Sequence, residues 1–142
     1  MALSERDATF LDSHHAAAMI TVAPDGTAKA ARVAVALVDG RLWSSGTADR
    51  ARTRRLRRDP RCTLYVHDDR FAYMTLETAV TILDGPDAPQ QSLRLFRILE
   101  DRPSGPLSWF DGEIEEEAFL AAMVEEQRLI YEFEVLRTYG LY

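Results

Sequence analysis

Residues 16–45 read AAAMITVAPDGTAKAARVAVALVDGRLWSS, and this stretch predicts three consecutive β-strands. Small, β-branched and other apolar residues fill each segment, and apolar positions alternate in places. The turn signals Pro24-Asp25-Gly26 and Asp39-Gly40 separate the segments, because Asp-Gly pairs favour tight hairpins. The sequence therefore predicts an antiparallel meander whose strands cover Ala16–Val22, Thr27–Val38 and Arg41–Ser45.

Helices and strands also follow on either side of this meander. Ser4 and Asp7 form a capping-box pattern, which predicts a helix from residue 4 to residue 13. Further helices are expected over 50–58, 88–100 and 113–126, and further strands over 62–68, 71–83 and 129–136, with 104–112 as a loop. Thr47 or Asp49 is the expected cap of the helix at 50–58. The pattern indicates one mostly β domain over residues 1–142: a six-stranded antiparallel split barrel with short flanking helices.

The composition is that of a globular protein and argues against several other classes. The chain has 142 residues, of which 46% are hydrophobic and 28% charged. No apolar run approaches the roughly 20 residues that cross a bilayer, so no membrane association is expected. The N-terminal residues contain acids and no apolar stretch, which argues against a secretory signal. A single cysteine, Cys62, cannot form an internal disulfide, and we expect a cytoplasmic protein.

A strongly basic segment interrupts this acidic chain, whose net charge is −6. Residues 50–61 contain seven arginines and one acid, Asp59, whereas residues 111–126 contain seven acids and no base. An acidic whole argues against nucleic-acid binding, which depends on neutralising many phosphates. A small positive cluster after the hydroxyl-rich run SSGTAD suits a compact anion such as a phosphate. The alternative is a solvated helix whose arginines form salt bridges with acids elsewhere in the chain.

Other chemistry-bearing residues have simpler structural explanations. The sequence contains no nucleophile elbow, catalytic triad signature or phosphate-binding glycine loop, so we predict no catalytic side chain. His67-Asp68-Asp69 fits the turn after a strand better than a metal site, and no metal is expected. Cys62 reads as a small core residue. Trp109 and Phe110 either line a pocket or pack in the core.

The order of these elements resembles the pyridoxamine 5′-phosphate oxidase-like split-barrel family of flavin and deazaflavin proteins. The resemblance is carried by residues 19–66, and above all by the basic helix, Asp-Pro and apolar strand in RARTRRLRRDPRCTLYV. It covers roughly residues 5–85 and returns at the final TYGLY. Within the family the chain is most similar to the actinobacterial branch that uses coenzyme F420. True pyridoxamine phosphate oxidases are longer and carry an additional basic substrate motif near the C-terminus.

The resemblance implies a homodimer that holds its cofactor in a groove at the dimer interface. It implies hydride transfer between reduced F420 and a small organic substrate, performed by the cofactor rather than by a protein side chain. FMN is the alternative cofactor, and a flavin- or deazaflavin-binding protein without catalysis is the alternative from another class. Many F420-binding relatives have lysine at the position of Arg52. The implied cofactor-binding residues are Ser44, Ser45, Thr47, Arg50, Arg52, Arg57, Met19, Val33 and Val35.

Overall fold

A computed structural model, which describes residues 2–142, contains a closed six-stranded antiparallel barrel. The order of neighbouring strands around the barrel is β1-β2-β3-β8-β5-β4. The barrel strands are β1 (Ala16–Val22), β2 (Ala28–Val38), β3 (Arg41–Thr47), β4 (Arg61–His67), β5 (Tyr73–Leu83) and β8 (Arg128–Leu141). This arrangement confirms the predicted mostly β fold and its six-stranded antiparallel barrel.

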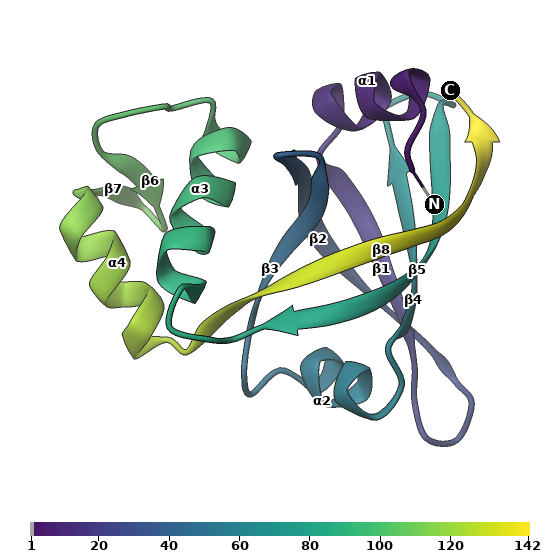
Figure 1. The fold of residues 1–142 in the computed structure, drawn as a ribbon, viewed down its shortest axis with the longest axis horizontal. Coiled ribbons are helices and arrows are strands. Elements are labelled where there is room, and N and C mark those ends of the chain that lie inside the picture. Colours follow the sequence, from purple (N-terminus) through teal and green to yellow (C-terminus); the bar gives the residue numbers. More distant parts are fainter. Residues whose placement is uncertain (1) are drawn as a thin grey trace.

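Short helices cover the two ends and one side of the barrel (Figure 1). Helix α1 lies beside the C-terminal end of β8, and α2 lies at the opposite end, between β3 and β4. Helices α3 and α4, with a small hairpin of β6 and β7, form a group at the side. Their bounds are α1 (Glu5–Ser13), α2 (Ala51–Arg58), α3 (Ala88–Glu100), β6 (Leu107–Trp109), β7 (Gly112–Ile114) and α4 (Glu116–Glu125).

Three hydrophobic clusters hold these parts together. The largest fills the barrel with inward-facing side chains from all six strands, together with Phe10 and Leu11 of α1 and Leu56 of α2. A second cluster joins α3 to the outside of β2, β3 and β8, with Trp43 at its centre. The third lies between α3, α4 and β6, and it contains Phe119 and Met123. The side group is therefore attached to the barrel by a continuous apolar contact.

The structure corrects three local predictions. Residues 104–112 are not only a loop, because they contain β6 and the first residue of β7. Helix α4 begins at Glu116 rather than 113, since Gly112–Ile114 pairs with Leu107–Trp109 instead. The N-cap of α2 is Arg50, which makes no side-chain capping bond, so neither Thr47 nor Asp49 caps this helix. The Thr47 hydroxyl donates to the Asp49 carboxylate instead.

Within residues 2–142 no helix is both long and apolar enough to cross a bilayer.

Candidate functional site

The last residues of β3 present two hydroxyls on the outside of the barrel. Leu42 belongs to the barrel core and Trp43 to the outer cluster beneath α3, so alternation along the strand places Ser45 and Thr47 on the outer face. Ser44 faces inward, is 1% exposed, and donates its hydroxyl to a β2 carbonyl at 2.7 Å. Of the three hydroxyls predicted for the site, that of Ser44 therefore already donates a hydrogen bond inside the barrel.

The two outer hydroxyls differ in their hydrogen bonding. Thr47 Oγ1 donates to Asp49 Oδ1 at 2.7 Å, and this bond lowers the pKa of Asp49. Ser45 Oγ is buried and has no hydrogen-bond partner within residues 2–142. A buried hydroxyl without a partner costs free energy, so its presence points to a group that the chain itself does not supply.

Arg52 stands out among the arginines of the basic segment. Its side chain is half-buried, and the guanidinium carbon lies 5.8 Å from the centroid of the Tyr131 ring. Its Nε is buried and has no partner in the part of the chain that the structure describes. Burial lowers the pKa of Arg52, and the nearby charges of Arg50 and Arg128 act in the same direction. A buried cation beside two other cations is a favourable place for an anion.

Five other arginines of the segment bond to groups within the chain. The ion pairs of Arg57 and Arg61 are on the surface and match the salt-bridge alternative. The partners are the Asp49 carbonyl for Arg54 (2.6 Å), Thr21 Oγ1 for Arg55 (2.7 Å), Asp84 for Arg57 (2.9 Å), the Val22 carbonyl for Arg58 (2.5 Å) and Asp59 for Arg61 (2.8 Å). Of the seven arginines in residues 50–61, Arg50 and Arg52 are the two without such a bond in residues 2–142, although the nearby Tyr131 side chain acts to raise the pKa of Arg52.

Arg128 belongs to the same cluster and was not anticipated from the sequence. It lies opposite Thr47 in the register between β3 and β8. Arg128 Nη2 donates to Glu126 Oε1 at 2.9 Å, and the Arg128 guanidinium carbon lies 5.1 Å from the centroid of the Trp109 ring. Only the pairing of β3 with the distant β8 brings this residue to the site, so no local pattern marks it.

The predicted apolar members of the site lie inside the barrel. Met19, Val33 and Val35 are 1%, 8% and 0% exposed and belong to the barrel core. Their side chains are therefore not assembled with the arginines, and only their backbone is available to a ring outside the barrel. Strand β2 changes partner next to this point: residues 28–34 pair with β1, and residues 35–38 pair with β3.

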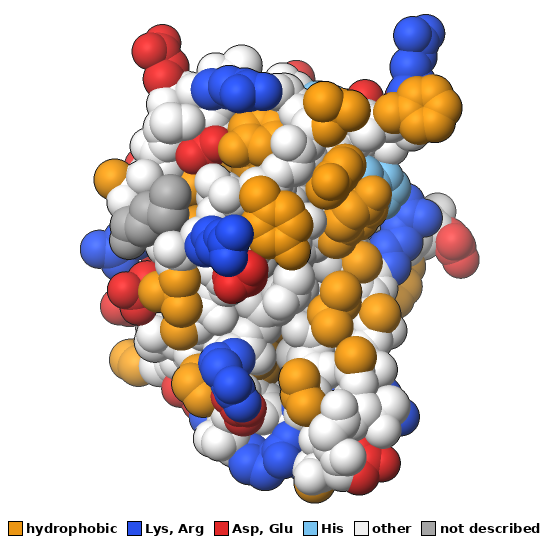
Figure 2. Space-filling model, turned by 90° about the vertical axis from the view of Figure 1, so that its right-hand side faces the viewer, with side chains coloured by type: hydrophobic (Ala, Val, Ile, Leu, Met, Phe, Trp, Pro, Cys, Tyr) orange, Lys and Arg blue, Asp and Glu red, His pale blue; other side chains and the backbone are white. Residues whose placement is uncertain are grey.

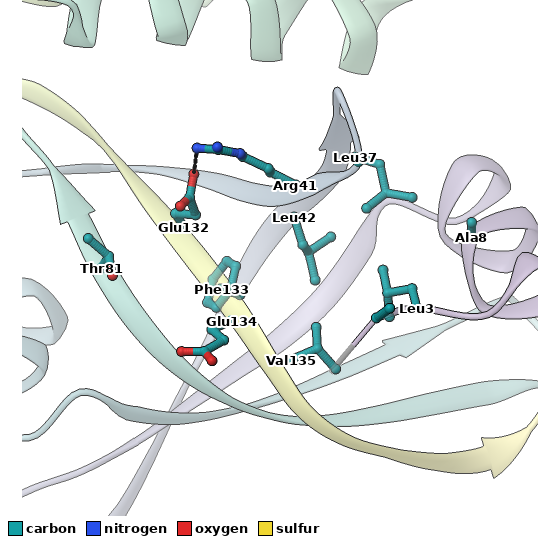
Figure 3. Close-up of a pocket in the computed structure, with 12 residues that line it drawn as sticks. Leu3, Ala8, Leu37, Arg41, Leu42, Thr81, Glu132, Phe133, Glu134 and Val135 are labelled. Carbon is teal, nitrogen blue, oxygen red and sulfur yellow. Dashed lines mark hydrogen bonds and ion pairs between the residues drawn. The ribbon is translucent and has the colours of Figure 1, made fainter.

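Two cavities near these residues are each lined by two carboxylates and one arginine, and they differ in whether the arginine is paired. An open pocket of about 450 Å³ beside the arginine cluster is lined by Thr47, Asp49, Arg50 and Glu126. A pocket of about 580 Å³ lies between α1, β3 and β8 (Figure 3), with Glu132 and Glu134 at its edge. In that view Arg41 reaches Glu132, which also accepts the Trp43 indole N–H at 2.8 Å. The second pocket therefore offers carboxylates without a free cation and does not suit an anion.

The remaining chemistry-bearing residues have structural partners. His67 Nδ1 lies 2.8 Å from the Asp68 carbonyl oxygen in the turn after β4. Burial raises the pKa of Cys62 to about 12, which confirms it as an inert core thiol. Residues 2–142 contain no group of three or more His, Cys, Asp or Glu arranged to hold a metal ion. Trp109 packs edge-on against Phe96 and Phe119, whereas Phe110 is 79% exposed.

Comparison with known proteins identifies the family. The sequence profile of the pyridoxamine 5′-phosphate oxidase family matches residues 3–121, and the chain belongs to this family. Curated protein sequences provide no match. The fold resembles conserved protein Rv2991 from Mycobacterium tuberculosis, with 21% identity, coverage of 98% of this chain and 84% of that one, and a TM-score of 0.73.

Two further solved structures share the fold. One is an F420 reductase, with 21% identity, coverage of 96% of this chain and 98% of that one, and a TM-score of 0.68. The other is General Stress Protein 26 from Bacillus anthracis, with 12% identity, coverage of 99% and 95%, and a TM-score of 0.68. At these identities the likeness concerns the arrangement of the chain and not its chemistry.

Proposed function

We propose that this protein is an F420-dependent oxidoreductase that transfers a hydride between the reduced deazaflavin and a small organic substrate. The observation that carries the proposal is that Ser45 Oγ on β3 and Arg52 Nε on α2 are two of the three buried side-chain atoms without a hydrogen-bond partner within residues 2–142, the third being Ser92 Oγ on α3. A phosphate or phosphodiester group is a suitable partner for each of these atoms, because its oxygens accept hydrogen bonds and carry negative charge. The resemblance of residues 19–66 to the F420-using branch of the family favours the deazaflavin over other anionic cofactors.

The residues of the cluster fit an anionic cofactor in charge and position. Within residues 2–142 neither Arg50 nor Arg52 forms an ion pair, whereas Arg128 is paired with Glu126. Ser45 adds a short donor at the end of β3, whereas the Thr47 hydroxyl already donates to Asp49, and the start of α2 adds free backbone N–H groups. When bound, the deazaflavin would supply the hydride chemistry. The task of these side chains is to hold the cofactor's negative end and so fix the position of its ring system.

Substitution of the arginines tests the proposal directly. Arg52→Ala should weaken F420 binding by about 1.5–3 kcal/mol, or roughly tenfold to a hundredfold in Kd, because a charged hydrogen bond is lost. Binding is followed through the intrinsic fluorescence of Trp43 and Trp109. Arg58→Ala is the matched control on the same helix, since its guanidinium bonds to the Val22 carbonyl at 2.5 Å.

The same titration decides the role of Arg57. The family resemblance assigns it to the cofactor, but its side chain is paired with Asp84. A loss of affinity in Arg57→Ala would mean that this exposed pair opens when the cofactor binds. If Arg52→Ala binds F420 and FMN as tightly as the unaltered protein, the proposed site is wrong. A large loss of apo stability in Arg52→Ala at unchanged affinity would instead assign the arginine a structural role.

FMN is the second candidate, because its single phosphate suits the same two atoms. Protein that retains a yellow chromophore with an FMN spectrum through purification would favour FMN. Tight F420 binding with weak FMN binding would favour the deazaflavin. Binding of either cofactor without turnover of any electron acceptor would indicate a binding protein rather than an enzyme. A cytoplasmic location completes the proposal, on the ground of the single, buried cysteine.

We also propose that the protein is a homodimer with the cofactor groove at its interface. Apolar residues line the outside of β4, β5 and β8: the rings of Tyr65 and Tyr73 stack with centroids 5.3 Å apart, and Tyr139 is 46% exposed. Thr75 lies between Tyr65 and Tyr139 in the strand register. We call Tyr65, Tyr73, Tyr139 and Leu141 the outer tyrosine face. Hydrophobic side chains gather on this side of the molecule (Figure 2), as expected of a surface that pairs with a second copy.

A further inference from the structure

A buried chain of hydroxyls ties the barrel to the helix that carries Arg52. The Tyr131 hydroxyl is hydrogen-bonded to Thr53 Oγ1, and Thr53 Oγ1 donates to the Thr47 carbonyl at 2.7 Å. Since the threonine hydroxyl has one hydrogen, the Tyr131 hydroxyl must be the donor to Thr53. Tyr131 and Thr53 are both 0% exposed. Three elements, β8, α2 and β3, are therefore joined at one point with a defined direction of donation.

Gly46 leaves space for this series of hydrogen-bonded hydroxyls. A Cβ atom at this position would overlap the ring and hydroxyl of Tyr131, so the tyrosine reaches α2 only because residue 46 lacks a side chain. Arg52 directly precedes Thr53 and lies over the Tyr131 ring. Burial lowers the pKa of Arg52, whereas the Tyr131 side chain acts in the opposite direction. Tyr131 thus contacts both the side-chain hydroxyl of Thr53 and the guanidinium of Arg52.

We propose that Tyr131 is a positioning residue, which acts through Thr53 to hold Arg52 where its Nε meets the bound anion. This inference rests on the proposed function, because it names the residue that sets the geometry of the same anion site. The ring of Tyr131 packs against the Arg52 guanidinium, and the Tyr131 hydroxyl, through Thr53, fixes the first turn of α2 relative to the end of β3. The barrel core, rather than the surface, then determines how well the site is preorganised.

A double-mutant cycle tests whether Tyr131 acts through Arg52. Kd values for F420, FMN and inorganic pyrophosphate are measured for Tyr131→Phe, Arg52→Ala and the double variant. Tyr131→Phe should weaken binding by about fivefold to tenfold in the unaltered background, as expected for coupled neighbours, and should have no effect in the Arg52→Ala background. Thr53→Val should behave like Tyr131→Phe, and Thr53→Ser, which keeps the hydroxyl, should restore affinity.

Loss of stability must be separated from loss of position. Val66→Ala removes buried methyl groups from the barrel core on β4, away from the hydrogen-bonded hydroxyls of Tyr131 and Thr53. This variant serves as the stability control. If Val66→Ala weakens binding as much as Tyr131→Phe, or if the Tyr131→Phe effect persists in the Arg52→Ala background, the positioning role is wrong. An affinity loss in Arg52→Ala without one in Tyr131→Phe would overturn this inference and leave the proposed function standing. Unchanged affinity in Arg52→Ala would overturn the proposed anion site, and failure of the unaltered protein to bind F420 would overturn the proposed function.

Discussion

At the scale of single residues, one guanidinium differs from its neighbours by what it lacks. Arg54, Arg55 and Arg57 lie on the same helix and all find acceptors in the chain, whereas the Nε of Arg52 is buried without one. A row of arginines in a sequence does not distinguish these cases. The difference arises because Arg52 faces Tyr131, whereas Arg54 meets a backbone carbonyl, Arg55 the Thr21 hydroxyl and Arg57 the carboxylate of Asp84.

Gly46 is the residue whose substitution the structure penalises most clearly. Gly46→Ala should destabilise the fold by about 1–3 kcal/mol, because the added methyl overlaps the Tyr131 ring and forces a backbone or rotamer shift. Thermal or urea unfolding measures the change. Gly85→Ala is the matched control, since a Cβ at Gly85 has no atom within 4 Å. Equal stability of the two variants would contradict the described position of Tyr131.

At the scale of elements, the first turn of the N-terminal helix α1 is held by a capping box and by a hydrogen bond from Tyr142. Ser4 and Asp7 form the predicted capping box, with Asp7 N donating to Ser4 Oγ at 3.0 Å and Ser4 N donating to Asp7 Oδ2 at 2.9 Å. The Tyr142 hydroxyl donates to the other oxygen of Asp7 at 2.5 Å. The cap is therefore also the contact that joins the two termini of the chain.

This arrangement predicts a dependence of stability on acid. Burial acts to raise the pKa of Asp7, but the hydrogen bonds from Tyr142 and Ser4 outweigh it and leave the pKa below its ordinary value of 3.8. A carboxyl group whose pKa is lower in the folded state stabilises the fold at pH values above its pKa in the unfolded state. This contribution is lost as the pH falls through the pKa of the folded state. Between pH 5 and the acid limit of folding, Asp7→Asn should therefore show a flatter fall of melting temperature than the unaltered protein. Asp12→Asn, on the exposed side of α1, should keep the original slope.

At the scale of the whole molecule, the barrel leaves one apolar face uncovered. The side group of α3 and α4 buries Trp43 and Ile130 on the outside of β3 and β8, whereas the outer tyrosine face on β4, β5 and β8 has no such cover. Tyr65, Tyr139 and Leu141 are 38%, 46% and 62% exposed. Exposed rings gathered on one sheet face are typical of an interface between subunits.

Charge placed on this face should therefore dissociate the dimer. Sedimentation velocity should show a dimer for the unaltered protein and a monomer for Tyr65→Glu combined with Tyr139→Glu, because buried carboxylates without partners oppose association. Val124→Glu, at an exposed position on α4, is the control and should remain dimeric. A monomeric unaltered protein, or a dimer that survives both substitutions, would show that this face is not the interface.

Much of the fold followed from local patterns in the sequence. Hairpin signals and strand alternation predicted the barrel strands, the capping box predicted α1, and β1 and α3 have the predicted bounds. Residues 104–115 were harder, because a three-residue strand is too short to show alternation, and the acids of 113–117 suit a helix start as well as a turn. The pairing of Leu107–Trp109 with Gly112–Ile114 decided that region.

The sequence by itself determined most of the secondary structure and the presence of a basic cluster, since these depend on neighbours along the chain, and the family resemblance supplied the barrel. Only the tertiary structure decided which cations remain without partners. Arg57 finds Asp84, Arg128 finds Glu126, and Arg52 lies over Tyr131, each through contacts set by strand pairing or helix docking. Desolvation and hydrogen bonding act between groups that are close in space. A local sequence pattern does not show which residues, distant along the chain, will lie close together in the fold.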